Sequence, residues 1–318
     1  MEGRIIGVFG TDPALKGNFL SSVAKKSEAE GAIVLYHRVD SGLAYSFLDD
    51  AQFPEKIQGP SRIASISDYA YYLLPRFMKI TPPDGELAVL LDSWGADGSI
   101  LSMDEGATKD VTSFFKGTRL KDYAVEQRNP ESSVIDLSRI QKGKGSPSGA
   151  LVYVDRAFSV KGVGVVVLGF VLGGKVSVHD QLRLIPSADG MRAEVRGIQV
   201  NDVDHDSVER GVRVGLSLRG VELKDLSKVS WMDDGSFATG DSLSFEYRQS
   251  GFYKQSVEGR DMHLQLPGEM VTCKLKVDGP NVVATLPAQS PVWEGMRVAV
   301  IDLNGKGLRV AGGGTCRL

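Results

Sequence analysis

The sequence has few of the residues that build covalently linked or metal-held folds. Among 318 residues there are two cysteines, Cys273 and Cys316, and four histidines. Two cysteines cannot form a disulfide framework or a four-ligand metal site, and the histidines show no ligand spacing. The composition therefore predicts neither a disulfide-stapled domain nor a metal centre, and it favours residence in the cytoplasm.

Long hydrophobic runs are absent as well. No stretch of the sequence approaches the ~18 apolar residues that a membrane-spanning helix needs. Residues 1–10 carry one arginine and lead directly into a strand-like segment, which is not the pattern of a secretory signal. We therefore expect no membrane partner.

An excess of positive charge is also missing. The chain has 37 Lys and Arg against 40 Asp and Glu, a net charge of −3. A protein that binds nucleic acid through bulk charge is far more basic, so the count excludes a general DNA or RNA coat and predicts no DNA partner. The net charge is −3 over residues 1–148, −1 over 149–236 and +1 over 237–318. Any basic surface must be a local patch.

Strands and helices alternate over the first 140 residues. The strands are short and continuously apolar, as in Leu87-Ala-Val-Leu-Leu91, which is typical of sheets covered on both faces. This pattern predicts a doubly wound, mainly parallel sheet. The expected strands are residues 4–10, 32–39, 62–67, 86–92 and 123–128, and the expected helices are 16–30, 68–79 and 104–116.

The pattern changes after a linker at residues 141–149, which contains Gly, Ser, Pro and Lys but no leucine or valine. Beyond it, short Val-, Leu- and Ile-rich runs are separated by glycine-containing turns about every ten residues, as in β-barrels. A further break at Met232-Asp-Asp-Gly-Ser236 divides this half in two. We expect an α/β domain at residues 1–146 and two β-barrels at 149–235 and 236–318.

The first strand-to-helix turn contains part of a phosphate-binding loop. Its sequence is Gly10-Thr-Asp-Pro-Ala-Leu15-Lys16-Gly17. The first glycine and the lysine are in register, but Leu15 replaces the second glycine and Gly17 replaces the hydroxyl residue that binds magnesium. The alternatives at this point are a degenerate phosphate site and an ordinary turn with a solvated Lys16.

The second module resembles domain 2 of the translational GTPases. Residues 157–171, Ala-Phe-Ser-Val-Lys-Gly-Val-Gly-Val-Val-Val-Leu-Gly-Phe-Val, are similar to the opening strands of that barrel. Similar runs follow at 174–182, 195–199 and 211–221, and residues 295–314 resemble the closing strands of an EF-Tu-type domain 3. The resemblance therefore covers nearly the whole chain.

This resemblance implies that the first domain is a degenerate G domain with a P-loop NTPase-like fold. Gly10 and Lys16 take the phosphate-loop positions, Asp68 takes the place of the magnesium motif whose glycine has become Tyr71, and Asn129 takes the place of the guanine reader. It implies no catalytic residue and a loss of GTP hydrolysis, because each missing group is a metal or transition-state contact. GTP and magnesium stay open as ligands, and the alternatives are a divergent but active GTP-binding elongation factor and a protein-binding scaffold.

The resemblance also implies a pocket for the aminoacyl end of a tRNA on the first barrel. The matching positions are Asp155, Arg156, Phe158 and Arg213. The presence of two arginines among them resembles the positively charged pocket of the SelB branch. Among its members, the SelB-like factors of pyrrolysine-using methanogenic archaea are the most similar. The implied partners are aminoacyl-tRNA and, further, the ribosome. The alternative is a set of ordinary strand residues paired across a barrel rim.

In the third module, basic residues lie where family members contact the tRNA backbone. The residues are Arg297, Lys306 and Arg309. The resemblance implies a small tRNA contact there, and a solvated strand edge is the alternative.

Overall fold

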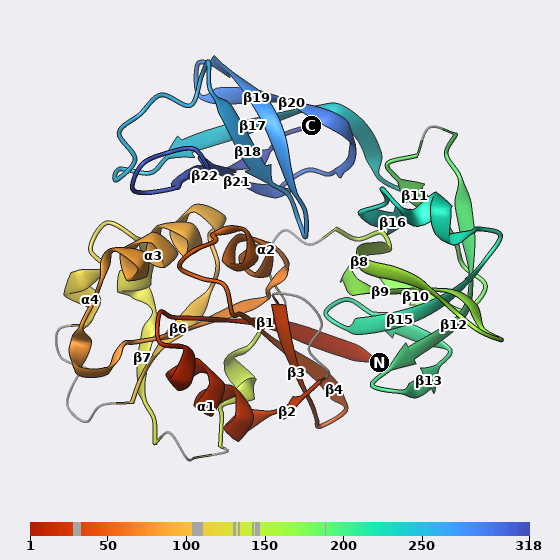
Figure 1. Cartoon of the computed structure of the whole chain (residues 1–318), viewed down its shortest axis with the longest axis horizontal. Coiled ribbons are helices and arrows are strands. Elements are labelled where there is room, and N and C mark those ends of the chain that lie inside the picture. The colour runs from red at the N-terminus through yellow and green to blue at the C-terminus, as the bar shows by residue number, and fades with distance from the viewer. Residues whose placement is uncertain are drawn as a thin grey trace.

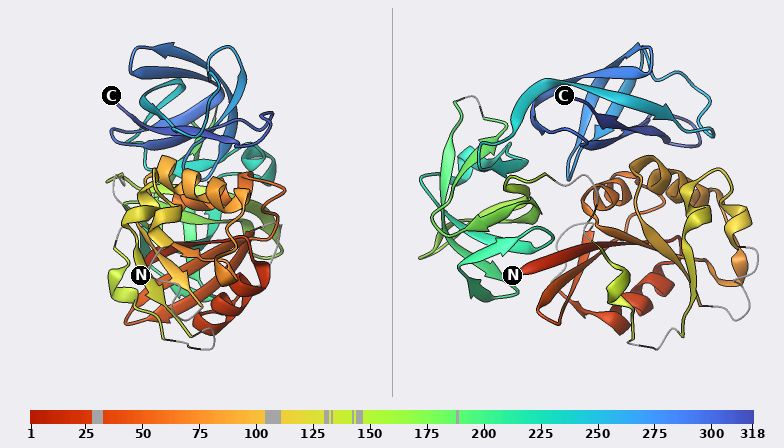
Figure 2. Two further views of the ribbon diagram at one scale, coloured as in Figure 1. Left: turned by 90° about the vertical axis from the view of Figure 1, so that its left-hand side faces the viewer. Right: turned by 180° about the vertical axis from the view of Figure 1, so that it is seen from behind.

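Three units, each built on one large β-sheet, follow one another along the chain in the computed structural model, which describes residues 1–27, 33–103, 111–129, 132, 134–141, 143, 147–187 and 189–318. The first sheet carries helices and the other two form barrels, so the predicted architecture, a P-loop-type α/β domain followed by two β-barrels, is confirmed. The three units surround a common centre, with the second barrel above the first domain and the first barrel beside both (Figure 1). Figure 2 shows the same arrangement from the side and from behind.

The first sheet has seven strands in the order β2-β3-β4-β1-β5-β6-β7. The central strand β1 is parallel to β4 and to β5, and β6 and β7 continue in parallel, whereas β3 pairs antiparallel with both β4 and β2. The sheet is therefore mixed and mainly parallel. The strands are β1 (Glu2–Phe9), β2 (Lys25–Lys26), β3 (Ile33–Asp40), β4 (Leu43–Asp50), β5 (Tyr69–Leu73), β6 (Gly98–Ser102) and β7 (Ala124–Gln127).

Helices cover both faces of this sheet, because successive side chains of a strand point to opposite faces. Ile5 of β1 packs in one core with α2 and α3, and Ile6 packs in another with α1. The two layers are visible in Figure 1, with α1 on one side of the sheet and α2 and α3 on the other. The helices are α1 (Pro13–Val23), α2 (Gln58–Ile66), α3 (Pro82–Trp94) and α4 (Val111–Phe114), and the 3-10 turns are Arg76–Met78, Arg119–Asp122 and Leu137–Arg139.

Three of the elements expected from the sequence are wrong. Residues 62–66 of the strand expected at 62–67, and the whole strand expected at 86–92, are helical rather than extended. The predicted helix at 68–79 is replaced by strand β5 and a 3-10 turn. The run Leu87–Leu91 is buried on every side because α3 lies between the sheet and the second barrel, so its hydrophobic pattern has no helical period. The signals that set α3 are local: a capping box between Thr81 and Asp84, and a left-handed C-cap.

Other boundaries differ less. Helix α1 ends at Val23 rather than at residue 30, and the sequence pattern missed strands β4 and β6. Of the helix expected at 104–116, residues 104–110 lie outside the described part of the chain, and 111–114 form α4.

The first barrel follows β8 to β16. Six of its strands form the ring β11-β16-β8-β9-β15-β12, which closes through pairing of β11 with β12. Aliphatic side chains fill its interior. The strands are β8 (Leu151–Val160), β9 (Gly164–Gly173), β10 (Lys175–Ser177), β11 (Gln181–Ile185), β12 (Arg192–Val200), β13 (Val203–His205), β14 (Ser207–Glu209), β15 (Arg213–Arg219) and β16 (Trp231–Asp233), with a 3-10 turn at Leu223–Leu226.

The second barrel is closed in the order β17-β20-β19-β18-β21-β22. Its core is continuous with the core formed by the first sheet, α2 and α3. Its strands are β17 (Ala238–Gln249), β18 (Asp261–Gln265), β19 (Met270–Asp278), β20 (Asn281–Val292), β21 (Arg297–Ile301) and β22 (Val310–Cys316).

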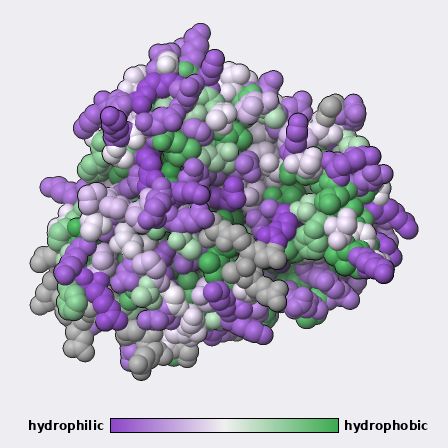
Figure 3. All heavy atoms as spheres, in the orientation of Figure 1, coloured by the Kyte–Doolittle hydropathy of each residue, from purple (hydrophilic) through white to green (hydrophobic). Residues whose placement is uncertain are grey.

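Polar contacts also fix the second barrel against the first domain. Arg309 binds Glu86 of α3 through both guanidinium and backbone N–H groups, with a closest N–O distance of 2.6 Å. At the rim, Arg248 lies 3.0 Å from Asp92. Hydrophilic residues follow the boundary between these two units on the face shown in Figure 3. Among the described residues, no helix is long and apolar enough to cross a membrane.

Candidate functional site

The turn between β1 and α1 is too short and too acidic to resemble an open phosphate cradle. Three residues, Gly10 to Asp12, separate the end of β1 from Pro13, the first residue of α1. The carboxylate of Asp12 caps the helix and accepts from the backbone N–H of Leu15 at 3.0 Å. A helix N-terminus attracts phosphate through those N–H groups, so here a fixed negative charge already occupies that position.

Lys16 points into the protein rather than toward solvent. Its Nζ donates to Asp49 Oδ1 at 2.6 Å and to the backbone oxygen of Asp50 at 2.9 Å, and the residue is 4% exposed. Burial raises the pKa of Asp49, and the charge of Lys16 partly offsets this rise. The solvated Lys16 that the sequence leaves open is therefore wrong.

The space beside Lys16 is small. A cavity of about 10 Å³ lies among Gly10, Lys16, Asp50 and Phe53, which is room for about one water molecule at most. With Asp12 at the helix start and the lysine neutralised by Asp49, these residues do not fit the triphosphate and magnesium that the family resemblance implies.

Asp68 and Asn129 are not brought next to Lys16. Asp68 lies just before β5, whereas Gly10 lies just after β1. Because the two strands are parallel, these residues lie at opposite ends of the strands. Asn129 follows β7, which is separated from β1 by β5 and β6, or roughly 14 Å at the usual strand spacing. The acidic residue beside Lys16 is Asp49, at the end of the strand parallel to β1.

The four pocket residues expected on the first barrel do lie together. Asp155, Arg156, Phe158 and Arg213 all line one cavity of about 660 Å³ between the first barrel and the first domain. Strand β8 contributes the first three and β15 the last, and both strands pair with β9. A cavity of this size is in the range of small-molecule sites.

Arg213 is held by two contacts. Its Nη1 lies 2.7 Å from Asp155 Oδ2, and its guanidinium carbon lies 4.8 Å from the centre of the Phe170 ring. The Arg213 side chain is 20% exposed. The pair therefore has a fixed orientation while part of it still faces the cavity. The same pairing is expected of ordinary strand residues paired across a barrel rim, which is the alternative that the sequence leaves open. The structure adds that both residues also line the cavity, and their role in a pocket stays a prediction.

The first domain supplies the other wall of the cavity. The residues come from β3, β4, the following loop and α2, and they are Ile33, Leu35, Leu48, Asp50, Gln52, Lys56, Gln58, Gly59, Arg62 and Ile66. Burial raises the pKa of Asp50, whose Oδ1 accepts from the N–H groups of Gln52 and Phe53. Sequence reasoning missed this wall, because nothing in the local pattern of residues 33–66 shows that they face a barrel.

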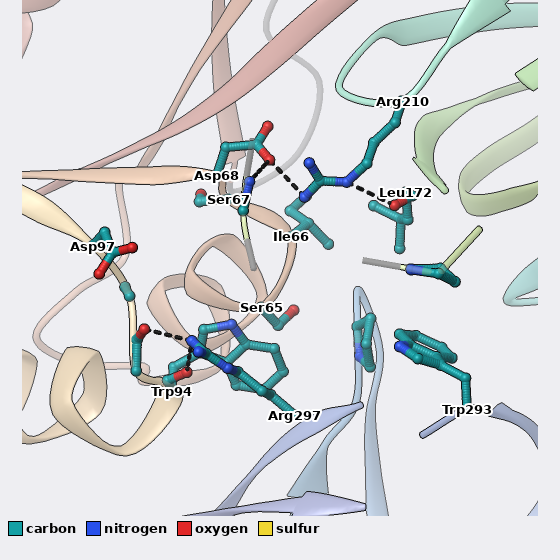
Figure 4. A pocket seen from close by; sticks show the side chains of 15 residues that line it. Ser65, Ile66, Ser67, Asp68, Trp94, Asp97, Leu172, Arg210, Trp293 and Arg297 are labelled. Carbon is teal, nitrogen blue, oxygen red and sulfur yellow. Dashed lines mark hydrogen bonds and ion pairs between the residues drawn. The ribbon is translucent and has the colours of Figure 1, made fainter. Parts of the chain in front are cut away.

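A second, smaller cavity lies where all three units meet. Figure 4 shows its two sides, with Asp68 bound to Arg210 near the first barrel and Arg297 bound to the backbone of Trp94 near the second. Its volume is about 70 Å³. Arg210 also donates to the backbone oxygen of Leu172 in its own barrel, and its ion pair with Asp68 joins that barrel to the first domain.

The basic residues expected to contact tRNA from the third module have different positions. Arg297 donates to the backbone oxygens of Trp94 and Gly95, and Arg309 binds Glu86. Both guanidinium groups are therefore bound at the interface with the first domain, and their contact with tRNA stays a prediction. Lys306 remains exposed.

Comparison with known proteins gives partial matches in sequence. No family model matches the chain. An uncharacterized protein of Methanocaldococcus jannaschii is 26% identical over 323 residues, 99% of each chain. The selenocysteine-specific elongation factor of the same organism is 42% identical over 73 residues, which are 23% of this chain and 15% of the factor. Elongation factor 1-alpha of Saccharolobus solfataricus is 35% identical over 115 residues, which are 36% of this chain and 23% of that factor.

Solved structures match over the whole chain. A bacterial selenocysteine-specific elongation factor, EF-Sec, superposes with a TM-score of 0.84 at 17% identity, and this chain spans 58% of its length. Elongation factor SelB of Methanococcus maripaludis, solved with the GTP analogue GppNHp, gives a TM-score of 0.78 at 19% identity over 79% of that factor. The narrower resemblance to the factors of pyrrolysine-using archaea stays a prediction. In fold over its whole length, and in sequence over parts of it, the chain is similar to the translational GTPases of the SelB type, as its sequence predicts.

Proposed function

We propose that this protein is a translation factor homologue that holds the aminoacyl end of a tRNA without turning over GTP. The observation that carries the proposal is the pairing of a closed phosphate turn with an open cavity in the same chain. The cavity measures about 660 Å³ and contains all four residues expected for an aminoacyl pocket, whereas about 10 Å³ lies beside Lys16.

The pocket would bind its ligand in one orientation, because its hydrogen-bonding groups and its apolar wall have fixed positions. The Asp155 carboxylate and the Arg213 guanidinium offer one acceptor and several donors, and their 2.7 Å pairing holds both in place. Phe158 and Phe170 give the cavity an apolar wall, against which an aminoacyl side chain or a base can pack. Arg156 adds a second positive charge from the barrel.

The absence of GTP turnover is inferred from the first domain's own contacts. A phosphate would have to displace the Asp12 carboxylate from the helix start and the Asp49 carboxylate from Lys16. Both displacements cost electrostatic energy that an ordinary phosphate-binding loop does not expend. A divergent but active GTP-binding factor and a protein-binding scaffold are the alternatives. The ribosome is proposed as a partner only through the likeness to SelB.

A gel-shift titration tests the proposal. One tRNA, aminoacylated or deacylated, is titrated with the wild-type protein at several salt concentrations without GTP. We expect a salt-dependent shift that is stronger for aminoacylated tRNA. Arg213→Ala should weaken it, and Arg219→Ala, an exposed residue at the end of the same strand, should not. If neither tRNA shifts, the scaffold alternative is supported instead.

A further inference from the structure

Arg62 is one of three charged residues that the first domain places on the cavity wall, together with Asp50 and Lys56. It lies on α2, which Figure 1 places between the first sheet and both barrels. The residue is partly exposed and lines the cavity. Its Nε is buried and finds no hydrogen-bond partner among the residues that the structure describes. A buried N–H without a partner is costly, so such a group is informative in a native fold.

The groups around Arg62 come from all three units. Burial raises the pKa of Asp50, of Tyr153 and of Glu269, and in each case the positive charge of Arg62 partly offsets the rise. Asp50 belongs to β4, Tyr153 to β8 and Glu269 to the turn before β19. Arg62 is thus close enough to act on these groups through its charge, and its Nε makes no hydrogen bond to them.

Positive charge is in excess on the cavity wall. Four cationic residues line it, against two carboxylates. Asp155 is engaged by Arg213. Asp50 Oδ1 accepts from two backbone N–H groups, while Asp50 Oδ2 is buried and has no hydrogen-bond partner among the described residues. The charged side chains of the wall are Lys56, Arg62, Arg156, Arg213, Asp50 and Asp155. The wall is therefore suited to a ligand that brings an anionic oxygen.

We propose that Arg62 is a specificity-determining residue that binds an anionic oxygen, a carboxylate or a phosphate, of the ligand held between the first domain and the first barrel. This inference rests on the proposed function, because it takes the ligand to be a tRNA end. A guanidinium presents a planar fork of donors that matches either oxyanion. The ligand would then be gripped from both sides, by Arg62 on α2 and by Arg213 on β15.

The test uses one tRNA in three forms: charged with glutamate, charged with glutamine, and deacylated. We expect Arg62→Gln to lower affinity for at least one form by about 10- to 100-fold, and Arg62→Lys to lower it less. A loss confined to glutamyl-tRNA identifies a carboxylate of the aminoacyl group as the partner, and an equal loss on all three forms identifies a tRNA phosphate. Arg76→Gln, an exposed arginine of the same domain, should change nothing.

Two results would overturn the inference. One is unchanged binding of every form by Arg62→Gln. The other is a fall in the melting temperature of the free protein by more than about 2 °C in both Arg62 variants, with affinity falling in proportion, which indicates a structural role. If the wild-type protein binds none of the three tRNAs, the proposed function itself fails.

Discussion

Asp68 of the first domain and Arg210 of the first barrel form a buried ion pair, with Arg210 Nη2 2.5 Å from Asp68 Oδ1. The Asp68 side chain is fully buried, and it also accepts from the backbone N–H groups of Ile5 and Gly143. One carboxylate thus joins the central strand, the linker and the first barrel. The residue that resembles a magnesium ligand in the sequence serves as a domain connection in the structure.

Replacing Arg210 should therefore destabilise the protein. Arg210→Met leaves a buried carboxylate with two N–H donors and no counter-charge, which should cost roughly 3 kcal/mol in the free energy of unfolding, measured in urea. Arg317→Met is the control, because Arg317 pairs with Glu294 and Glu246 at the surface and its loss should not be measurable. Equal stability of the two variants would contradict the connecting role of Asp68.

The Lys16–Asp49 pair allows a test of whether Lys16 stabilises the fold or is available to a nucleotide. Lys16→Met leaves Asp49 buried without its cation, so the free energy of unfolding should fall by about 3 kcal/mol. The double variant Lys16→Met/Asp49→Leu should recover most of that loss, because no buried charge remains. Urea denaturation measures both. A Lys16→Met variant as stable as the wild type would mean that the lysine is not internally paired.

The sequence predicts the fold more completely than it predicts the candidate site. The alternation of strands and helices in the first 140 residues and the turn-rich pattern after residue 149 predict the fold correctly. Both patterns remain recognisable even when a single buried helix is mistaken for a strand. The type of the elements at 62–67 and 86–92 was not readable, because helices α2 and α3 are buried on several sides by the second barrel.

The pocket shows the same division. The family resemblance of the first barrel is enough to single out four residues that the structure places on one cavity: Asp155, Arg156, Phe158 and Arg213. Arg62 joins them only through docking of the first domain, which no local pattern encodes.

The interface between α3 and the second barrel can be tested with a double-mutant cycle. Glu86 and Arg309 are 8% and 19% exposed and make several hydrogen bonds, so their coupling energy should exceed ~1.5 kcal/mol. Asp92 and Arg248 lie in the same interface, but the arginine is 70% exposed, and their coupling should be ~0.5 kcal/mol or less. Similar coupling for both pairs would show that burial does not decide their strength.

Acid should weaken the second barrel through His263. Burial lowers the pKa of His263 below 6.5, and the charges of Asp302 and Asp261 partly offset this effect. The folded state therefore binds the proton less readily than the unfolded state, so stability present above pH 6.5 is lost as the pH falls through the folded pKa. In melting curves between pH 7.5 and 5, His263→Gln should lose less stability than the wild type. An identical pH slope would exclude this histidine as a contributor.

The central claim is that the cavity binds aminoacyl-tRNA while the first domain needs no nucleotide. The most direct measurement is a titration of aminoacylated tRNA into the protein without nucleotide and again with millimolar GTP and magnesium, with direct calorimetry of GTP beside it. We predict the same tRNA affinity in both titrations and no GTP binding in the micromolar range. Binding of tRNA only in the presence of GTP, or micromolar affinity for GTP, would contradict it.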